Sequence, residues 1–162
     1  MSVDIAAKTD KELALLIGNH ERRHSLGGPL MLAAVAEQSR RRDGGLDLDR
    51  TLELILDATR AGRFVTEKEI AAQSGQGWAK VKAKVANHVR ALSILEHARS
   101  GTMPGVAVVP EANRADGALA GDALATFEAL CLALNRKEKL RGQPLVSSER
   151  AKLLALAVGK AA

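Results

Sequence analysis

Two groups of side chains in the sequence have types and spacings that could do chemistry. The first, His20-Glu21-Arg22-Arg23-His24, matches H-E-x-x-H, in which two imidazoles on one helix bind zinc and the glutamate is the general base. Against a zinc hydrolase, Arg22 and Arg23 place two cations inside the motif, and Leu30 stands where the longer motif needs a third histidine. We interpret the segment as a polar helix end, and we predict no metal and no cofactor.

The second group is the basic segment from Trp78 to Leu92, which contains no acidic residue. At about 100° per residue, its valines and Leu92 fall on one face of a helix, which leaves lysines, alanines and Arg90 on the other. A helix made slim by exposed alanines can enter the major groove of DNA, which is about 12 Å wide. The residues that we predict to contact DNA are Lys68, Gln76, Lys80, Lys82, Lys84, Asn87 and Arg90.

The charge of the chain is concentrated where this segment lies. The 162 residues carry 24 Lys and Arg against 19 Asp and Glu, a formal net charge of +5. Residues 61–110 hold 7 basic and 3 acidic side chains, and this difference of +4 accounts for most of the total. Local excess positive charge favours a polyanionic partner, for which nucleic acid is the first candidate.

Composition excludes several other classes of protein. A hydrophobic fraction of 46% argues against a disordered chain, and an aromatic fraction of 2% predicts a core of Ala, Leu and Val, which suits packed helices. A single cysteine, Cys131, excludes an internal disulfide and a Cys-rich zinc site. No apolar run approaches the roughly 18 residues of a membrane span, so we expect a cytoplasmic protein with no membrane partner.

Capping patterns and breaks predict the elements that position the two groups. Thr9 and Thr66 each begin a capping box, Pro29 suits a first helical turn, and Gly62 suits the residue after a helix. Six predicted helices cover about 9–24, 29–42, 49–61, 66–73, 78–92 and 122–134, and a seventh covers the C-terminal end from Ser147 or Ser148. For the helix at 78–92 we prefer an extension to 99. In the third and sixth of these, Asp49 and Asp122 are the expected caps.

Two short segments are predicted as strands. Gly105 to Pro110, rich in valine, is the best strand candidate, and it would pair with Arg63 to Val65. Residues 111–121 are predicted to form a loop. The sequence therefore predicts a mainly α fold with a minimal β element.

The spacing within residues 67–81 is typical of a helix-turn-helix. Counting from Glu67, Ala71 is fifth, Gly75 ninth and Val81 fifteenth, which supplies a small residue at the helix crossing, a glycine in the turn and an apolar anchor. We predict a helix-turn-helix or winged-helix core with flanking helices. Its expected domains are an N-terminal helical pair (1–45), the core (46–112) and a C-terminal helical segment (113–162).

Residues 49 to 110 also resemble a known family. Gly62-Arg63-Phe64-Val65-Thr66, Glu69-Ile70-Ala71, Trp78-Ala79-Lys80-Val81 and the segment 104–109 are similar to the winged-helix domain of the alkyltransferase-like DNA-binding proteins. The resemblance implies that the helix from Trp78 to Arg90 engages DNA. The Pro-Cys-His-Arg segment of that family is missing, so the resemblance does not imply alkyl transfer.

We therefore predict a protein that binds nucleic acid and is not an enzyme. Duplex DNA is the expected partner, and a transcriptional regulator or an accessory factor would fit. A homodimer is expected, because helix-turn-helix proteins commonly bind DNA as dimers. The apolar faces around Leu13, Leu16, Leu130 and Leu153 are candidates for this contact as well as for the core. The alternatives are the zinc-dependent hydrolase and a helical adaptor that binds other proteins.

Overall fold

The chain forms seven α-helices and two 3₁₀ helices in a computed structural model that describes residues 2–135 and 137–161. The α-helices are α1 (Asp10–Arg22), α2 (Pro29–Arg42), α3 (Leu48–Arg60), α4 (Glu67–Gln73), α5 (Trp78–Ser100), α6 (Gly121–Leu134) and α7 (Gly142–Ala161). The 3₁₀ helices are η1 (Pro104–Ala107) and η2 (Glu111–Asn113). The described residues contain no strand, so the mainly α prediction is confirmed.

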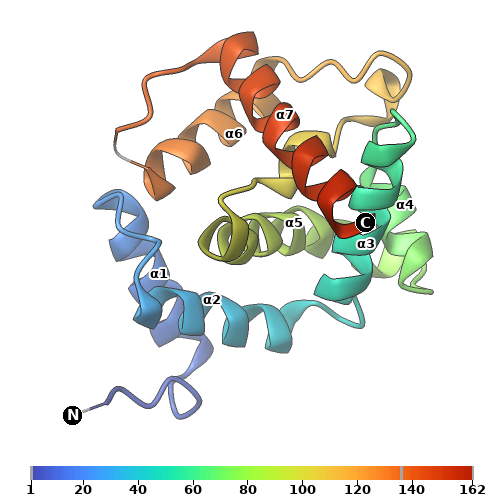
Figure 1. The fold of residues 1–162 in the computed structure, drawn as a ribbon. Helices are drawn as coiled ribbons and strands as arrows, with labels where there is room; N and C mark the ends of the chain where they lie inside the picture. Colours follow the sequence, from blue (N-terminus) through green and yellow to red (C-terminus); the bar gives the residue numbers. More distant parts are fainter. Residues whose placement is uncertain (1, 136, 162) are drawn as a thin grey trace.

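Helix α5 runs through the middle of the molecule (Figure 1). Helices α2 and α4 and the η1 turn pack against it, while α1 packs on α2 and α7 on α3. In its first half only one side of α5 is buried, through Val81 and Val85. Residues 91–94 are all buried, which means that neighbours surround the second half of the helix. The continuation of this helix beyond Leu92 is confirmed, and it ends at Ser100.

Local capping explains the helix starts that were predicted correctly. The side chain of Thr9 accepts a hydrogen bond from the backbone of Glu12 and the Glu12 side chain accepts one from the backbone of Thr9; Thr66 and Glu69 repeat the arrangement. Gly62 follows α3 with φ +68°, a left-handed conformation that favours glycine. These features depend on residues within one turn of each other, so the sequence alone reveals them.

The predicted strand at 105–110 is wrong. Pro104 begins the η1 turn, and the backbone N–H of Gly105 donates to Ser93 Oγ at 2.9 Å, which holds the segment against α5. One parallel bridge, between Val65 and Val108, is all that remains of the expected pairing within the described residues.

Three predicted helix starts also need correction. Asp47 caps α3 in place of Asp49 by accepting from the backbone N–H of Arg50 at 2.9 Å. Helix α6 begins at Gly121, so Asp122 lies in its first turn. Helix α7 begins at Gly142, well before Ser147, because a proline is compatible with the first turn of a helix and Pro144 does not interrupt it.

The leucines proposed for dimer contact belong largely to the core. Leu13, Leu130 and Leu153 are buried within the single chain, and Leu16 is partly buried. The predicted homodimer would therefore need other apolar side chains for its contact. Exposed ones include Leu15, Leu30, Leu154 and Val158. In the part of the chain that the structure describes, no helix combines the length and apolar character needed to cross a membrane.

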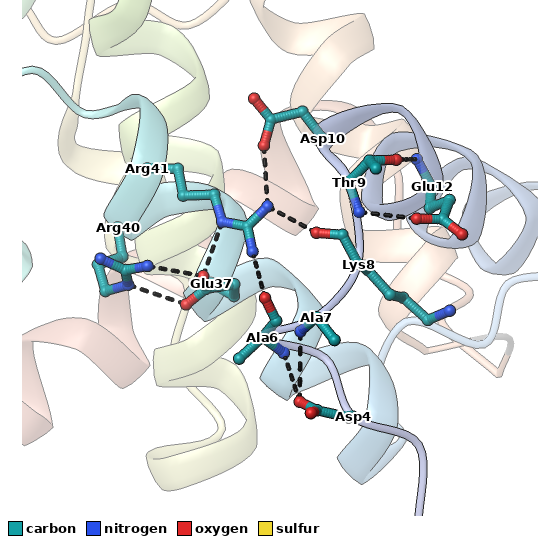
Figure 2. Close-up of polar contacts among 10 residues, drawn as sticks. All are labelled: Asp4, Ala6, Ala7, Lys8, Thr9, Asp10, Glu12, Glu37, Arg40 and Arg41. Carbon is teal, nitrogen blue, oxygen red and sulfur yellow. Dashed lines mark hydrogen bonds and ion pairs between the residues drawn. The ribbon is translucent and has the colours of Figure 1, made fainter.

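Arg41 attaches the N-terminal segment to α2 (Figure 2). Its guanidinium donates to the backbone carbonyls of Lys8 and Ala6 at 2.8 and 2.9 Å and to Asp10 Oδ1 at 3.0 Å. It also donates to Glu37 Oε1 at 2.7 Å, and Arg40 pairs with the same carboxylate. These two arginines lower the pKa of Glu37 to about 2.

Arg41→Ala should release residues 2–9 from α2, because it removes the donor shared by Lys8 and Ala6. We expect faster amide hydrogen exchange there, measured by mass spectrometry, with little change in α5. The matched control is Arg40→Ala, which removes an equal charge but leaves these bonds in place. Equal exchange in both variants would contradict the assignment.

Folding lowers the pKa of Glu37, so its ionised carboxylate stabilises the folded state. This contribution to stability should be complete above the usual glutamate range and disappear as pH falls towards 2.

Candidate nucleic-acid interface

Helices α4 and α5 are joined by a tight turn at residues 74–77. Gly75 adopts φ +69° in this turn, and Gly77 is the N-cap of α5. Ile70 and Ala71 of α4 and Val81 of α5 are buried, which is the role that the sequence spacing predicted for these positions. The two helices are therefore held together by a small apolar contact, and the start of α5 is fixed at the surface.

The first ten residues of α5 present a basic outer face. Lys80 and Lys82 are exposed, and the nearby Ala79, Ala83 and Ala86 are exposed as well. Lys80 Nζ donates to Gln76 Oε1 in the turn at 3.0 Å. Among the described residues, neither Lys82 nor Lys84 has a carboxylate within ion-pair distance. This face thus carries positive charge that the protein does not neutralise.

The C-terminal end of α2 extends this basic face. A hollow of about 380 Å³, which we call the α2–α5 hollow, is lined by Arg42 of α2 and by Lys84 and Asn87 of α5. Arg42 is exposed and, unlike Arg40 and Arg41, has no carboxylate partner among residues 2–135 and 137–161. Lys84 lies over Gly44, where a Cβ would be 2.7 Å from its Nζ. Glycine at position 44 therefore leaves room for this lysine.

A buried polar network fixes α2 and α3 against α5. His88 is fully buried, its Nδ1 lies 2.7 Å from Asp43 Oδ2, and its Nε2 lies 2.8 Å from Thr51 Oγ1. The Thr51 hydroxyl donates its single hydrogen to the carbonyl of Asp47, so it accepts from His88. Ser39 also donates to Asp43 Oδ2 at 2.5 Å. Both ring nitrogens therefore have a partner, and the network sets the rotation of α5 relative to α2 and α3.

The predicted DNA-contacting residues do not all come together. Gln76, Lys80, Lys84 and Asn87 lie along the turn, the start of α5 and the side facing α2, and Lys82 is exposed on the other flank of the helix. Lys68 is exposed on α4, beside a separate hollow that also contains Trp78. Arg90 forms an ion pair with Glu21 of α1 at 2.7 Å.

Helix periodicity correctly predicted that Lys80 and Lys82 face outward, but His88, an isolated histidine that the sequence predicts at or near the surface, is fully buried. Periodicity could not reveal what covers the outer side of the helix. Arg90 points away from the valine face, yet α1 reaches it and supplies a carboxylate. Conversely, the predicted contacts do not include the arginines at 40–42. Only the packing of α2 on α5 shows that Arg42 lies beside Lys84.

The histidine motif does not have the helical register that a zinc site of this type needs. Helix α1 ends at Arg22, and His24 lies beyond it with φ +53°. His20 Nδ1 is 2.9 Å from Ser25 Oγ. Within residues 2–135 and 137–161 there is no group of three or more His, Cys, Asp or Glu side chains that could hold a metal ion.

The single cysteine is not an activated nucleophile. Cys131 is buried on α6, and burial is the main cause that raises the pKa of its thiol to about 12. Because the thiolate is the reactive form, such a thiol reacts poorly at neutral pH.

Comparisons of the chain with protein-family models, with curated proteins and with solved structures found no match. The similarity to the alkyltransferase-like winged-helix domain thus stays an expectation based on the residues quoted above. Any function must be argued from the arrangement of charge, shape and hydrogen bonds in this chain.

His88→Leu should lower the free energy of unfolding by about 3 kcal/mol, because it leaves the buried Asp43 carboxylate without its hydrogen-bond partner on α5. Urea denaturation followed by circular dichroism measures the change. His97→Leu is the matched control, since His97 lies on the same helix but is only partly buried; we expect less than about 1 kcal/mol there. Equal losses in the two variants would show that the network does not hold the helices together.

Proposed function

We propose that this protein binds duplex DNA, with α4, the turn and α5 acting as a helix-turn-helix. Residues 78–87 of α5 would lie in the major groove. The observation that carries the proposal is the run of lysines without acidic partners on the alanine-rich outer face of α5. Ion pairing within the protein does not account for this run, because Lys80 and Lys82 are exposed and Lys84 lies over Gly44 without a carboxylate partner among the described residues.

Shape supports the same conclusion. An α-helix with its side chains is about 10–12 Å in diameter, and the major groove is about 12 Å wide. Ala79, Ala83 and Ala86 keep the outer face narrow, and their exposure leaves the backbone of α5 close to its surface. A helix with large side chains at these three positions would fit the groove less well.

The side chains divide into two roles under this proposal. Lys80, Lys82 and Lys84 would contact phosphates, which determines affinity and position but carries no sequence information. Asn87 is exposed on the same helix and has the amide group that pairs with the edge of adenine. Arg42 would contact the phosphate backbone next to Lys84. Arg90 is left out, because its charge is already paired with Glu21.

In place of the winged helix expected from the sequence, the proposal is a helix-turn-helix without a β wing. Segment 105–110, which would have formed the wing, packs against α5 and contributes one bridge to Val65. A regulator of transcription and an accessory factor for DNA transactions would use this interface in the same way.

Changing Lys80, Lys82 and Lys84 together to Ala should weaken binding to random duplex DNA by at least about a hundredfold at low salt. Each lost phosphate contact should also reduce the slope of log affinity against log salt by about 0.9. Fluorescence anisotropy at several salt concentrations measures both quantities, and circular dichroism checks folding.

The matched control for this experiment changes Lys11, Lys139 and Lys160 to Ala. These exposed lysines lie on α1, on the segment before α7 and on α7, so they remove the same charge from other surfaces. If both triple variants lost equal affinity, binding would depend on net charge alone and α5 would not be the interface.

Arg42→Ala should weaken DNA binding about three- to tenfold and lower the salt slope by about 0.9, because it removes one phosphate contact. Arg40→Ala should change neither quantity much, since that arginine is paired with Glu37 at 2.7 Å. The two substitutions remove equal charge from neighbouring positions of α2. The same anisotropy titration distinguishes them, and a larger loss for Arg40→Ala would place the α2–α5 hollow outside the interface.

A further inference from the structure

Two apolar hollows adjoin each other on the flank of α5 that faces α6. The first, which we call the Trp78 hollow, has a volume of about 300 Å³ and is lined by Trp78, Val109 and Pro110 among others. The second, the Phe127 hollow, has a volume of about 340 Å³ and includes Val89, Phe127 and Leu130. Glu67, Val108 and Ala123 line both. Hollows of about 300 to 1,000 Å³ with mostly apolar walls are typical of small-molecule sites.

Glu67 stands at the junction of these hollows without a partner. Its carboxylate has no hydrogen bond and no ion pair among the described residues, although the side chain is partly buried. Burial raises the pKa of this carboxyl. Glu67 is not used in the capping box of α4 either, because Glu69 supplies the capping carboxylate. The helix therefore leaves Glu67 available to a ligand.

The remaining charges also favour a positively charged ligand. Glu111 lines the Trp78 hollow and Asp122 the Phe127 hollow, and neither has an ion-pair partner in the described part of the chain. On the basic side there are Lys68, which is exposed, and Arg90, which is neutralised by Glu21. Among the charged residues that line the two hollows, three carboxylates and one cation therefore have no ion-pair partner in the described part of the chain.

We propose that the Trp78 and Phe127 hollows together bind a small apolar organic cation, of the aryl-substituted quaternary ammonium class. The indole ring of Trp78 would contact the cation, since aromatic faces attract quaternary ammonium groups. Glu67 supplies the counter-charge at the junction, and the apolar walls accept the hydrocarbon part of the ligand. The observations behind this site are independent of the DNA-binding proposal, although Trp78, Ala86 and Asn87 belong both to the segment proposed for the groove and to the walls of the hollows.

Trp78 makes the proposal directly testable, because it is the only tryptophan in the chain. Titration with benzyltrimethylammonium should give a saturable change in tryptophan fluorescence, and calorimetry should give the same affinity. Neopentylbenzene has the same shape without the charge, and it should bind at least about tenfold more weakly. Equal affinities for the two compounds, or no saturable binding of the cation by either method, would overturn the proposal.

Variants locate the site. Glu67→Gln should weaken binding of the cation about tenfold and leave the affinity for neopentylbenzene unchanged, whereas Glu53→Gln, an exposed acid on α3, should change neither. Ala123→Leu fills the space shared by the hollows and should abolish binding of both compounds. Circular dichroism confirms folding of each variant. Unchanged affinity for the cation in Glu67→Gln, or in folded Ala123→Leu, would contradict the assignment.

Discussion

The buried network centred on His88 determines how the rest of the structure presents its charges. A fully buried imidazole must have partners for both nitrogens, and Asp43 and Thr51 supply them from the ends of two different helices. Only one rotation of α5 about its axis brings His88 to both partners. Because residues on a helix turn together, that rotation also directs Lys84 towards α2 and keeps Lys82 in solvent.

The distance along the chain between interacting residues explains how much of the fold could be predicted from the sequence. The starts of α1 and α4 were predictable because Thr9 and Thr66 find their hydrogen-bond partners three residues away. Segment 105–110 was not, because its conformation depends on Ser93 of α5, twelve residues from Gly105. Valine-rich segments suit a strand only if a neighbouring strand is present, and the helices around this one provide none.

The candidate interface was predictable to a similar extent and for the same reason. A period of 3.6 residues identifies the buried face of α5 and, by exclusion, its lysines. The period does not show whether another helix packs on the outer side of α5. The sequence therefore predicted Arg90 to be available to DNA, although Glu21 of α1 forms an ion pair with it. It also could not predict that Arg42, which is 42 residues from Lys84, lies beside that lysine, since only the packing of α2 on α5 brings them together.

Helix α5 separates two surfaces of opposite character, and Asn87 borders both. On the α2 side the charges without partners are positive, Arg42 and Lys84; on the α6 side most are carboxylates, with Glu67 at their centre. A polyanion is attracted to the first surface and repelled from the second, while the reverse holds for an organic cation. This separation of charge would therefore draw DNA towards the α2 side of α5. The two proposed ligands would nevertheless compete, because Trp78, Ala86 and Asn87 line the hollows and also belong to the segment proposed for the groove.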